Sequence, residues 1–60
     1  MSFREARKKS NLTQKEVAQK LDTSRVTVAR WECSINNPKL NTLKKLAKLY
    51  NCTIDELINP

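Results

Sequence analysis

Glycine and histidine are absent from this 60-residue chain, and cysteine occurs only twice, as Cys33 and Cys52. Without histidine, two thiols are too few ligands for a zinc site. The chain also has no long apolar run and no signal peptide. These absences predict a cytoplasmic protein that carries no metal or cofactor, does not enter a membrane and keeps both cysteines reduced.

The length limits the kind of function. Sixty residues predict one domain, residues 1–60, which buries only about 60% of the surface that its unfolded chain exposes. So small a core is marginally stable and leaves little room for a catalytic cleft. We therefore expect a binding module and not an enzyme, and we infer no small-molecule ligand.

Positive charge is in clear excess. Twelve lysine and arginine residues against six aspartate and glutamate residues give a net charge of +6. A basic balance of this size suits a polyanionic partner, but charge alone does not distinguish DNA from RNA or from an acidic membrane.

Signals for helix starts are frequent. Three segments fit the Ser/Thr-x-x-Glu capping box, in which a hydroxyl and a carboxylate satisfy free backbone amides. They are Ser2–Glu5, Thr13–Glu16 and Thr53–Glu56. Ser24 is a further N-cap candidate that lacks the reciprocal glutamate.

A further helix is indicated by an apolar stripe. After the turn formers at positions 36–38, Leu43, Leu46, Ala47 and Tyr50 recur at the spacing of one helix face. Together with the caps, the stripe predicts helices at about 3–10, 14–21, 25–32, 41–50 and 54–58. The predicted fold is an all-α bundle of five short helices.

The lack of glycine bears on the turns of such a bundle. Helices often end on a residue with a left-handed backbone, which glycine adopts most easily. Asn11 and Asn51 follow the first and fourth predicted helices, and asparagine tolerates this conformation. Asp22 follows the second helix and adopts a left-handed backbone less readily, so we expect a conformational strain of order 1 kcal/mol there.

The second and third predicted helices suit a helix-turn-helix. Ala18 is small enough for close approach of the two helices, and Leu21, Val28 and Trp31 would form the wedge that sets their angle. At about 100° per residue, a second set of third-helix residues faces away from Val28. This outward set is Arg25, Val26, Ala29, Arg30 and Cys33.

The outward set is unusual for a solvated helix. Water favours lysine, glutamate or glutamine on such a face, whereas here two guanidinium groups lie beside small apolar side chains. The floor of a DNA major groove favours arginine for guanine edges and apolar groups for thymine methyls. An ordinary exposed surface is the plainer alternative.

The order of these motifs resembles the phage-repressor and Cro-type helix-turn-helix family, also called xenobiotic-response-element regulators. The resemblance covers essentially the whole chain. It is carried by Leu12-Thr13-Gln14, Val17-Ala18, Leu21, Ser24-Arg25 through Val28, Trp31-Glu32, Pro38-x-Leu40-x-Thr42-Leu43, Leu46-Ala47 and Ile54-Asp55-Glu56-Leu57. The chain departs from the family at Asp22 and Ser34, where glycine is usual, and at Cys33, where asparagine is frequent.

The resemblance implies a lambda-repressor-like domain that reads double-stranded DNA and regulates transcription, as a repressor. The third helix would enter the major groove, and a homodimer would bind a palindromic operator with half-site centres about 34–36 Å apart. The predicted base contacts are Gln14, Arg25, Val26, Ala29 and Arg30. The predicted phosphate contacts are Thr13, Thr23, Ser24, Thr27 and Arg7.

Other residues are assigned structural roles. We expect Arg7 and Glu32 to pair and to tie the first helix to the third. Trp31 and Tyr50 are expected in the core, and three lysines, Lys44, Lys45 and Lys48, on the wet face of the fourth helix. Ile35, Ile54 and Ile58 are candidates for a dimer interface, with closure of the core as the alternative.

Two other functions are compatible with a basic helical domain. The same fold could serve as a protein-interaction adaptor or an antitoxin-like module, for which an apolar or acidic third helix would be the cue. A basic surface could also hold RNA or acidic lipid, which would call for clustered exposed aromatics or a lysine-rich helix with large apolar anchors. The sequence shows neither cue clearly.

Overall fold

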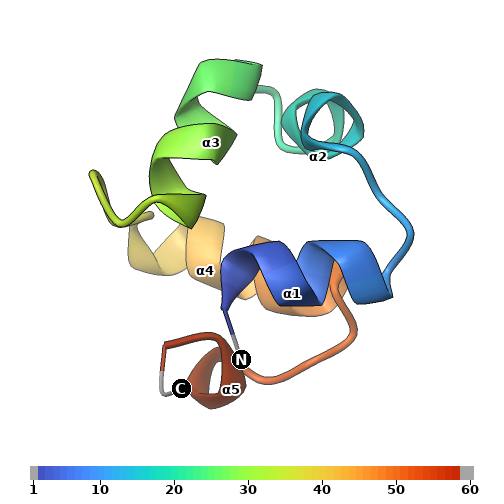
Figure 1. Ribbon diagram of the computed structural model, residues 1–60. Helices are drawn as coiled ribbons and strands as arrows, with labels where there is room; N and C mark the ends of the chain where they lie inside the picture. Colours follow the sequence, from blue (N-terminus) through green and yellow to red (C-terminus); the bar gives the residue numbers. More distant parts are fainter. Residues whose placement is uncertain (1, 59–60) are drawn as a thin grey trace.

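Five helices joined by short turns make up the computed structural model, which describes residues 2–58 (Figure 1). They are α1 (Phe3–Lys9), α2 (Gln14–Lys20), α3 (Arg25–Glu32), α4 (Leu40–Leu49) and α5 (Ile54–Ile58). The described residues contain no strand. The prediction of an all-α fold is confirmed, and no predicted helix boundary is wrong by more than one residue.

The predicted caps explain where most helices begin. Thr13 and Glu16 form the complete box, with the Glu16 amide donating to the Thr13 hydroxyl at 3.1 Å and the Thr13 amide donating to the Glu16 carboxylate at 3.0 Å. Thr53 and Glu56 repeat this arrangement, and Ser24 caps α3. At Ser2 the Glu5 amide donates to the Ser2 hydroxyl at 3.1 Å, and this hydroxyl donates to the Glu5 carboxylate at 3.3 Å.

Four helices end in the same way. The residues after their C-caps all have a left-handed backbone, namely Asn11 (φ 56°), Asp22 (φ 54°), Ser34 (φ 60°) and Asn51 (φ 54°). In each case the next amide donates to the carbonyl five residues before it, as from Leu12 to Arg7 at 3.2 Å and from Thr23 to Ala18 at 2.9 Å. This pair of features is the Schellman motif, built here without glycine.

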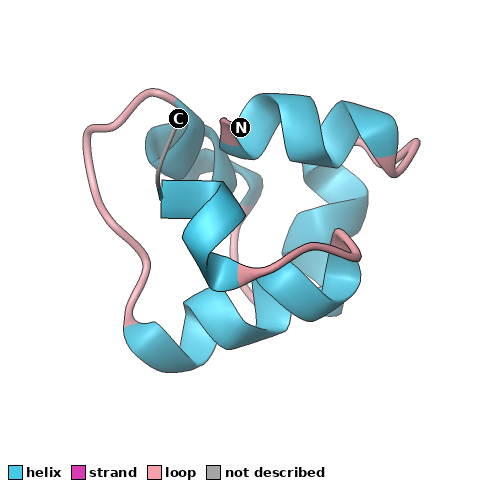
Figure 2. Ribbon diagram, turned by 90° about the horizontal axis from the view of Figure 1, so that it is seen from below, coloured by secondary structure: helices cyan, strands magenta, loops and turns pink. Residues whose placement is uncertain are grey.

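The core lies between α2, α3, α4 and the ends of α1 and α5. Val17, Val28 and Leu46 are its most buried large side chains. Trp31 and Tyr50 are also buried, which confirms their predicted place in the core. Figure 2 shows the helices surrounding this centre, and in Figures 1 and 2 α5 lies beside the start of α1.

We expect Ser34→Gly to stabilise the domain. A left-handed backbone costs an ordinary L-residue about 1–2 kcal/mol, and glycine avoids this cost but loses more entropy on folding. The net gain should be about 0.5–1 kcal/mol, which would raise the melting temperature by several degrees in a domain of this size. Thermal and denaturant unfolding measure the gain.

Asn11→Gly is the matched control for this prediction, since asparagine already tolerates a left-handed backbone. It should change the melting temperature less than Ser34→Gly does. A lower melting temperature for Ser34→Gly than for the parent protein would show that the turn is not strained.

Candidate nucleic-acid interface

Helices α2 and α3 pack closely against each other and are joined by a short turn (Figure 1). Ala18 and Val28 are buried between them and the core, and Leu21, at the end of α2, packs on the core while partly exposed. The predicted wedge therefore lies inside the fold, and the opposite face of α3 is free to meet a partner.

The predicted outward set does form one surface. Gln14, at the start of α2, joins it, and so does Ile35, just after α3. Arg25, Val26, Arg30 and Cys33 are exposed and Ala29 is half-buried. Together these residues line a shallow hollow of about 240 Å³, in which two guanidinium groups stand beside the 57% exposed Val26. We call it the α3 face.

The hydroxyl groups near the α3 face serve the backbone. Thr13 and Ser24 accept hydrogen bonds from Glu16 and Thr27 amides, and the Ser24 and Thr27 hydroxyls lie 2.9 Å apart. Thr13 and Ser24 are exposed, while Thr23 and Thr27 are half-buried. Phosphate contact by these four residues stays a prediction. The caps Thr13 and Ser24 begin α2 and α3, whose first residues, Gln14 and Arg25, line the α3 face.

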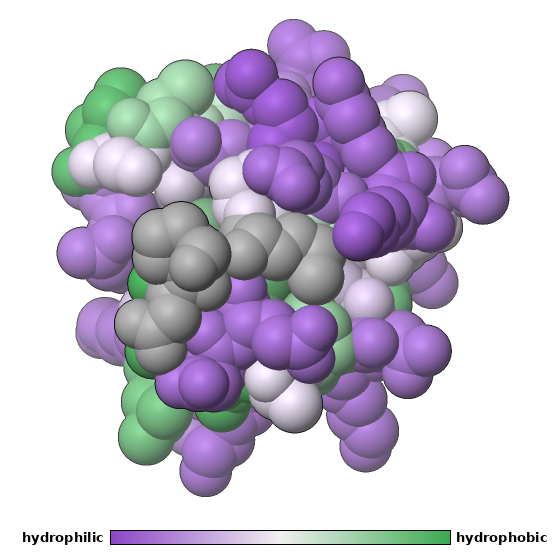
Figure 3. All heavy atoms as spheres, turned by 60° about the horizontal axis from the view of Figure 1, so that its bottom comes forward, coloured by the Kyte–Doolittle hydropathy of each residue, from purple (hydrophilic) through white to green (hydrophobic). Residues whose placement is uncertain are grey.

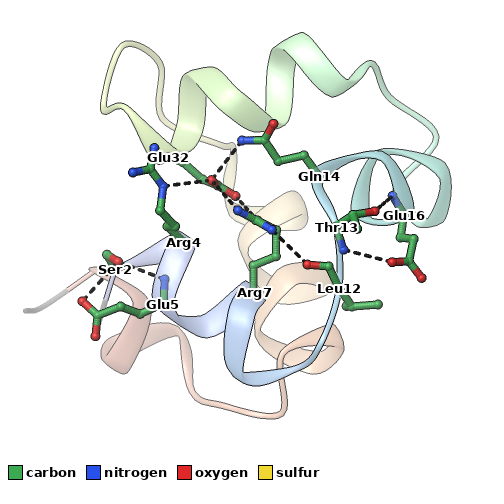
Figure 4. Close-up of polar contacts among 9 residues, drawn as sticks. All are labelled: Ser2, Arg4, Glu5, Arg7, Leu12, Thr13, Gln14, Glu16 and Glu32. Carbon is green, nitrogen blue, oxygen red and sulfur yellow. Dashed lines mark hydrogen bonds and ion pairs between the residues drawn. The ribbon is translucent and has the colours of Figure 1, made fainter.

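A buried carboxylate lies behind the α3 face. Only 1% of the Glu32 side chain is exposed. Its oxygens accept hydrogen bonds from Arg7 Nε at 2.6 Å, from Arg7 Nη2 at 3.3 Å and from Gln14 Nε2 at 3.1 Å (Figure 4). Arg4 Nε lies 3.5 Å from the same group. One side chain at the end of α3 thus joins α1 and α2.

Arg7 fills its structural role completely. Besides Glu32 it reaches the Leu12 carbonyl, to which Nη1 donates at 2.9 Å. Its predicted pairing with Glu32 is confirmed, and all three guanidinium nitrogens donate within the protein. Because only 13% of the side chain is exposed, the geometry favours this role over the phosphate contact also predicted for Arg7.

Charge and burial shift several pKa values around this network. Burial works to raise the pKa of Glu32, but hydrogen bonds from Arg7 and Gln14 outweigh it, and the net pKa is lowered. The hydrogen bond to Glu32 raises the pKa of Arg7 despite burial. Burial, assisted by the Glu32 charge, raises the pKa of Tyr50 to about 12. Glu32 and Arg7 are therefore both charged at neutral pH.

Sequence reasoning missed two members of the network. Arg4 is three residues before Arg7 on α1, and this spacing, which places both on one helix face, was a usable signal. The bond between Gln14 and Glu32 had no such signal, because it joins residues 18 positions apart on different helices. Gln14 is thus both part of the α3 face and a partner of the buried carboxylate.

The dimer candidates differ in exposure. Ile35 and Ile58 are 69% and 54% exposed, whereas Ile54 is half-buried and packs against the core. Ile58 also borders a hollow of about 530 Å³ with Phe3 and Leu43. The face of the molecule in Figure 3 is mostly hydrophilic, with apolar residues at its upper left and lower left. Both exposed isoleucines stay candidates for an interface between copies.

A model of the helix-turn-helix family matches residues 3–57. The chain belongs to this family, in its phage-repressor and Cro-type form. The predicted lambda-repressor-like fold is thereby confirmed. The match runs from the start of α1 into α5, and so includes both α2 and α3, which form the helix-turn-helix, and Glu32 behind them.

Three curated relatives carry the same domain. The transcriptional regulator ImmR of Bacillus subtilis is 40% identical over 93% of the chain, and the cryptic phage CTXphi transcriptional repressor RstR of Vibrio cholerae is 38% identical over 95%. The transcriptional activator BcrR of Enterococcus faecalis is 39% identical over 82%. The chain spans 44% of the length of ImmR, 51% of that of RstR and 24% of that of BcrR.

No solved structure matches the chain significantly. Among residues 2–58, no helix combines the length and the apolar character that crossing a membrane requires. Both cysteines are free thiols, Cys33 exposed on the α3 face and Cys52 half-buried.

We expect the Glu32 network to make the domain sensitive to acid. The folded-state pKa of Glu32 is lowered, so its stabilisation is complete above the unfolded value of about 4.3 and is lost as the pH falls through the folded-state pKa. By pH 3 the loss can reach at most about 1.8 kcal/mol, because one proton contributes about 1.36 kcal/mol per pH unit below the unfolded value. Denaturant unfolding between pH 7 and pH 3 measures it.

The double variant Arg7→Met/Glu32→Met is the control for this prediction. Replacing a buried pair by apolar residues of similar size is often tolerated, whereas removing one partner leaves an uncompensated charge. The double variant should show a shallower dependence of unfolding free energy on pH below about pH 5. An equal slope in both proteins would assign the acid sensitivity to other carboxylates.

Proposed function

We propose that this domain binds double-stranded DNA sequence-specifically as part of a transcriptional regulator, with α3 in the major groove. The observation that carries the proposal is the α3 face, where Arg25 and Arg30 flank Val26 on an exposed helix surface. The major groove is about 12 Å wide and admits an α-helix. Arginine forks suit guanine O6 and N7, and valine suits a thymine methyl.

Base contacts and phosphate contacts have different roles in the proposed recognition of DNA. We assign base contacts to Gln14, Arg25, Val26, Ala29 and Arg30, which share one hollow. We assign phosphate contacts to the starts of α2 and α3, through Thr13, Thr23, Ser24 and Thr27. Backbone amides at helix starts attract phosphate, and such contacts fix the register of a helix in the groove. Arg7 is left to its structural pair with Glu32.

We further propose that the domain acts as a homodimer on a palindromic operator, at the nucleoid in the cytoplasm. The exposed Ile35 and Ile58 give two copies an apolar surface to share. For the direction of regulation we favour repression, as the resemblance to phage repressors implies, and RstR, which is 38% identical, is itself named a repressor.

Selection of bound sequences from a random pool of duplex DNA tests the proposal. Enrichment of two inverted half-sites with centres about 34–36 Å apart would support both DNA reading and the dimer. Enrichment of a single half-site would remove the dimer and keep the reading. A pool that stays random would contradict sequence-specific binding.

Affinity for the selected operator should fall steeply with salt. Each phosphate neutralised by lysine or arginine gives a slope of about −0.9 in a plot of log affinity against log salt. A dimer that makes roughly 6–10 such contacts should lose on the order of 10³–10⁵ in affinity between 50 and 200 mM salt. Fluorescence anisotropy over this range measures the slope, and binding that ignores salt would rule out a nucleic-acid ligand.

Arg25→Ala should weaken binding to the operator by about 1–3 kcal/mol and relax the preference at one base pair in each half-site. Arg25 is the first residue of α3 and is exposed on the α3 face. Lys45→Ala removes the same charge from the exposed side of α4 and should change affinity little. Equal weakening of operator and scrambled DNA by Arg25→Ala would make Arg25 a phosphate contact.

A further inference from the structure

The side-chain amide of Gln14 is held in one orientation. Its nitrogen donates to Glu32 Oε1 at 3.1 Å, and Figure 4 shows the amide oxygen turned away from Glu32. An ionised carboxylate accepts hydrogen bonds and cannot donate them. A flipped amide would therefore place two acceptor oxygens together and lose the hydrogen bond. The chemistry of Glu32 selects one of the two possible amide orientations.

Glu32 is itself fixed. Its carboxylate receives two hydrogen bonds from Arg7, and its side chain is 1% exposed. Arg7 is anchored in turn on the Leu12 carbonyl. Because several partners hold the Glu32 carboxylate, its position is fixed. Gln14 therefore donates to an acceptor that does not move with it.

Gln14 lines the same hollow as Arg25 and Arg30, and the half of its amide that does not bond Glu32 is the part available to a partner on the α3 face. An amide nitrogen carries two N–H groups, and one bond to Glu32 leaves the other free to donate. Gln14 can thus offer one acceptor and one donor side by side. Among base edges in the major groove, only adenine offers the matching donor at N6 and acceptor at N7.

We propose that Glu32 is a positioning residue, which holds the Gln14 amide for bidentate recognition of adenine at one position of each half-site. The inference rests on the proposed reading of DNA by the α3 face. It adds that a residue out of reach of the DNA sets which base is preferred. Without that support, Gln14 could rotate to offer its donor group to guanine or thymine oxygen.

The first test uses the free protein and needs no DNA. Gln19 is an exposed glutamine on the same helix, so the two side-chain amides can be compared in one NMR spectrum. One of the two Gln14 amide protons, the one bonded to Glu32, should be shifted from its Gln19 counterpart and should exchange with solvent on the order of tenfold more slowly, the factor expected for a bond to a charged acceptor. Equal behaviour of the two amides would overturn the proposal.

The second test compares the sequences selected by variants. Gln14→Met removes the amide and should reduce the adenine preference at one position, worth roughly 5- to 150-fold, while the other positions keep theirs. Gln19→Met is the matched control and should change nothing. Arg7→Met/Glu32→Met removes the acceptor of the Gln14 amide without leaving the Arg7 guanidinium unpaired, so that this amide is free to take either orientation. This variant should lose the adenine preference or move it to guanine or thymine.

The outcomes separate this proposal from the proposed function. A protein that binds no DNA but shows the protected Gln14 amide contradicts DNA reading and leaves the support by Glu32 in place. Loss of the adenine preference in Gln14→Met but not in folded Arg7→Met/Glu32→Met contradicts the positioning role. If circular dichroism shows that Arg7→Met/Glu32→Met is unfolded, the comparison of Gln14 with Gln19 decides.

Discussion

The buried carboxylate of Glu32 holds together the parts of the domain on which the α3 face depends. It lies at the last residue of α3 and receives hydrogen bonds from Arg7 of α1 and Gln14 of α2. Removing a carboxylate from water costs several kcal/mol, and the cost is recovered only when its oxygens are well paired. An arrangement that separated Glu32 from Arg7 and Gln14 would leave this charge without these partners, so the network favours the packing in which α1, α2 and the end of α3 meet.

Much of the fold follows from local signals in the sequence. The cap of Thr13, the cap of Ser24 and the stripe through Leu46 each depend on neighbours within one or two helical turns, which is why they locate the helices closely. The outward set of α3 follows from helix geometry in the same way.

The parts of the site that escape prediction depend on tertiary placement. The distance from Gln14 to Glu32 is set by how α2 lies against the end of α3, and no spacing along the chain encodes it. The exposure of the three isoleucines also depends on how the helices pack against one another. Ile54 is drawn onto the core beside the buried Leu57, while Ile58, one helical turn later, is left outside.

The four turns closed without glycine have a consequence for how the chain folds. Each Schellman motif is completed by hydrogen bonds that reach back five residues or fewer, and each side-chain cap reaches forward only three. Closing such short loops takes tens of nanoseconds, and a helical domain rich in local contacts folds within microseconds to milliseconds. A residue other than glycine at these turns also narrows the range of conformations open to the unfolded chain. The hydrogen bonds at the helix ends can therefore form before the long-range contacts between helices.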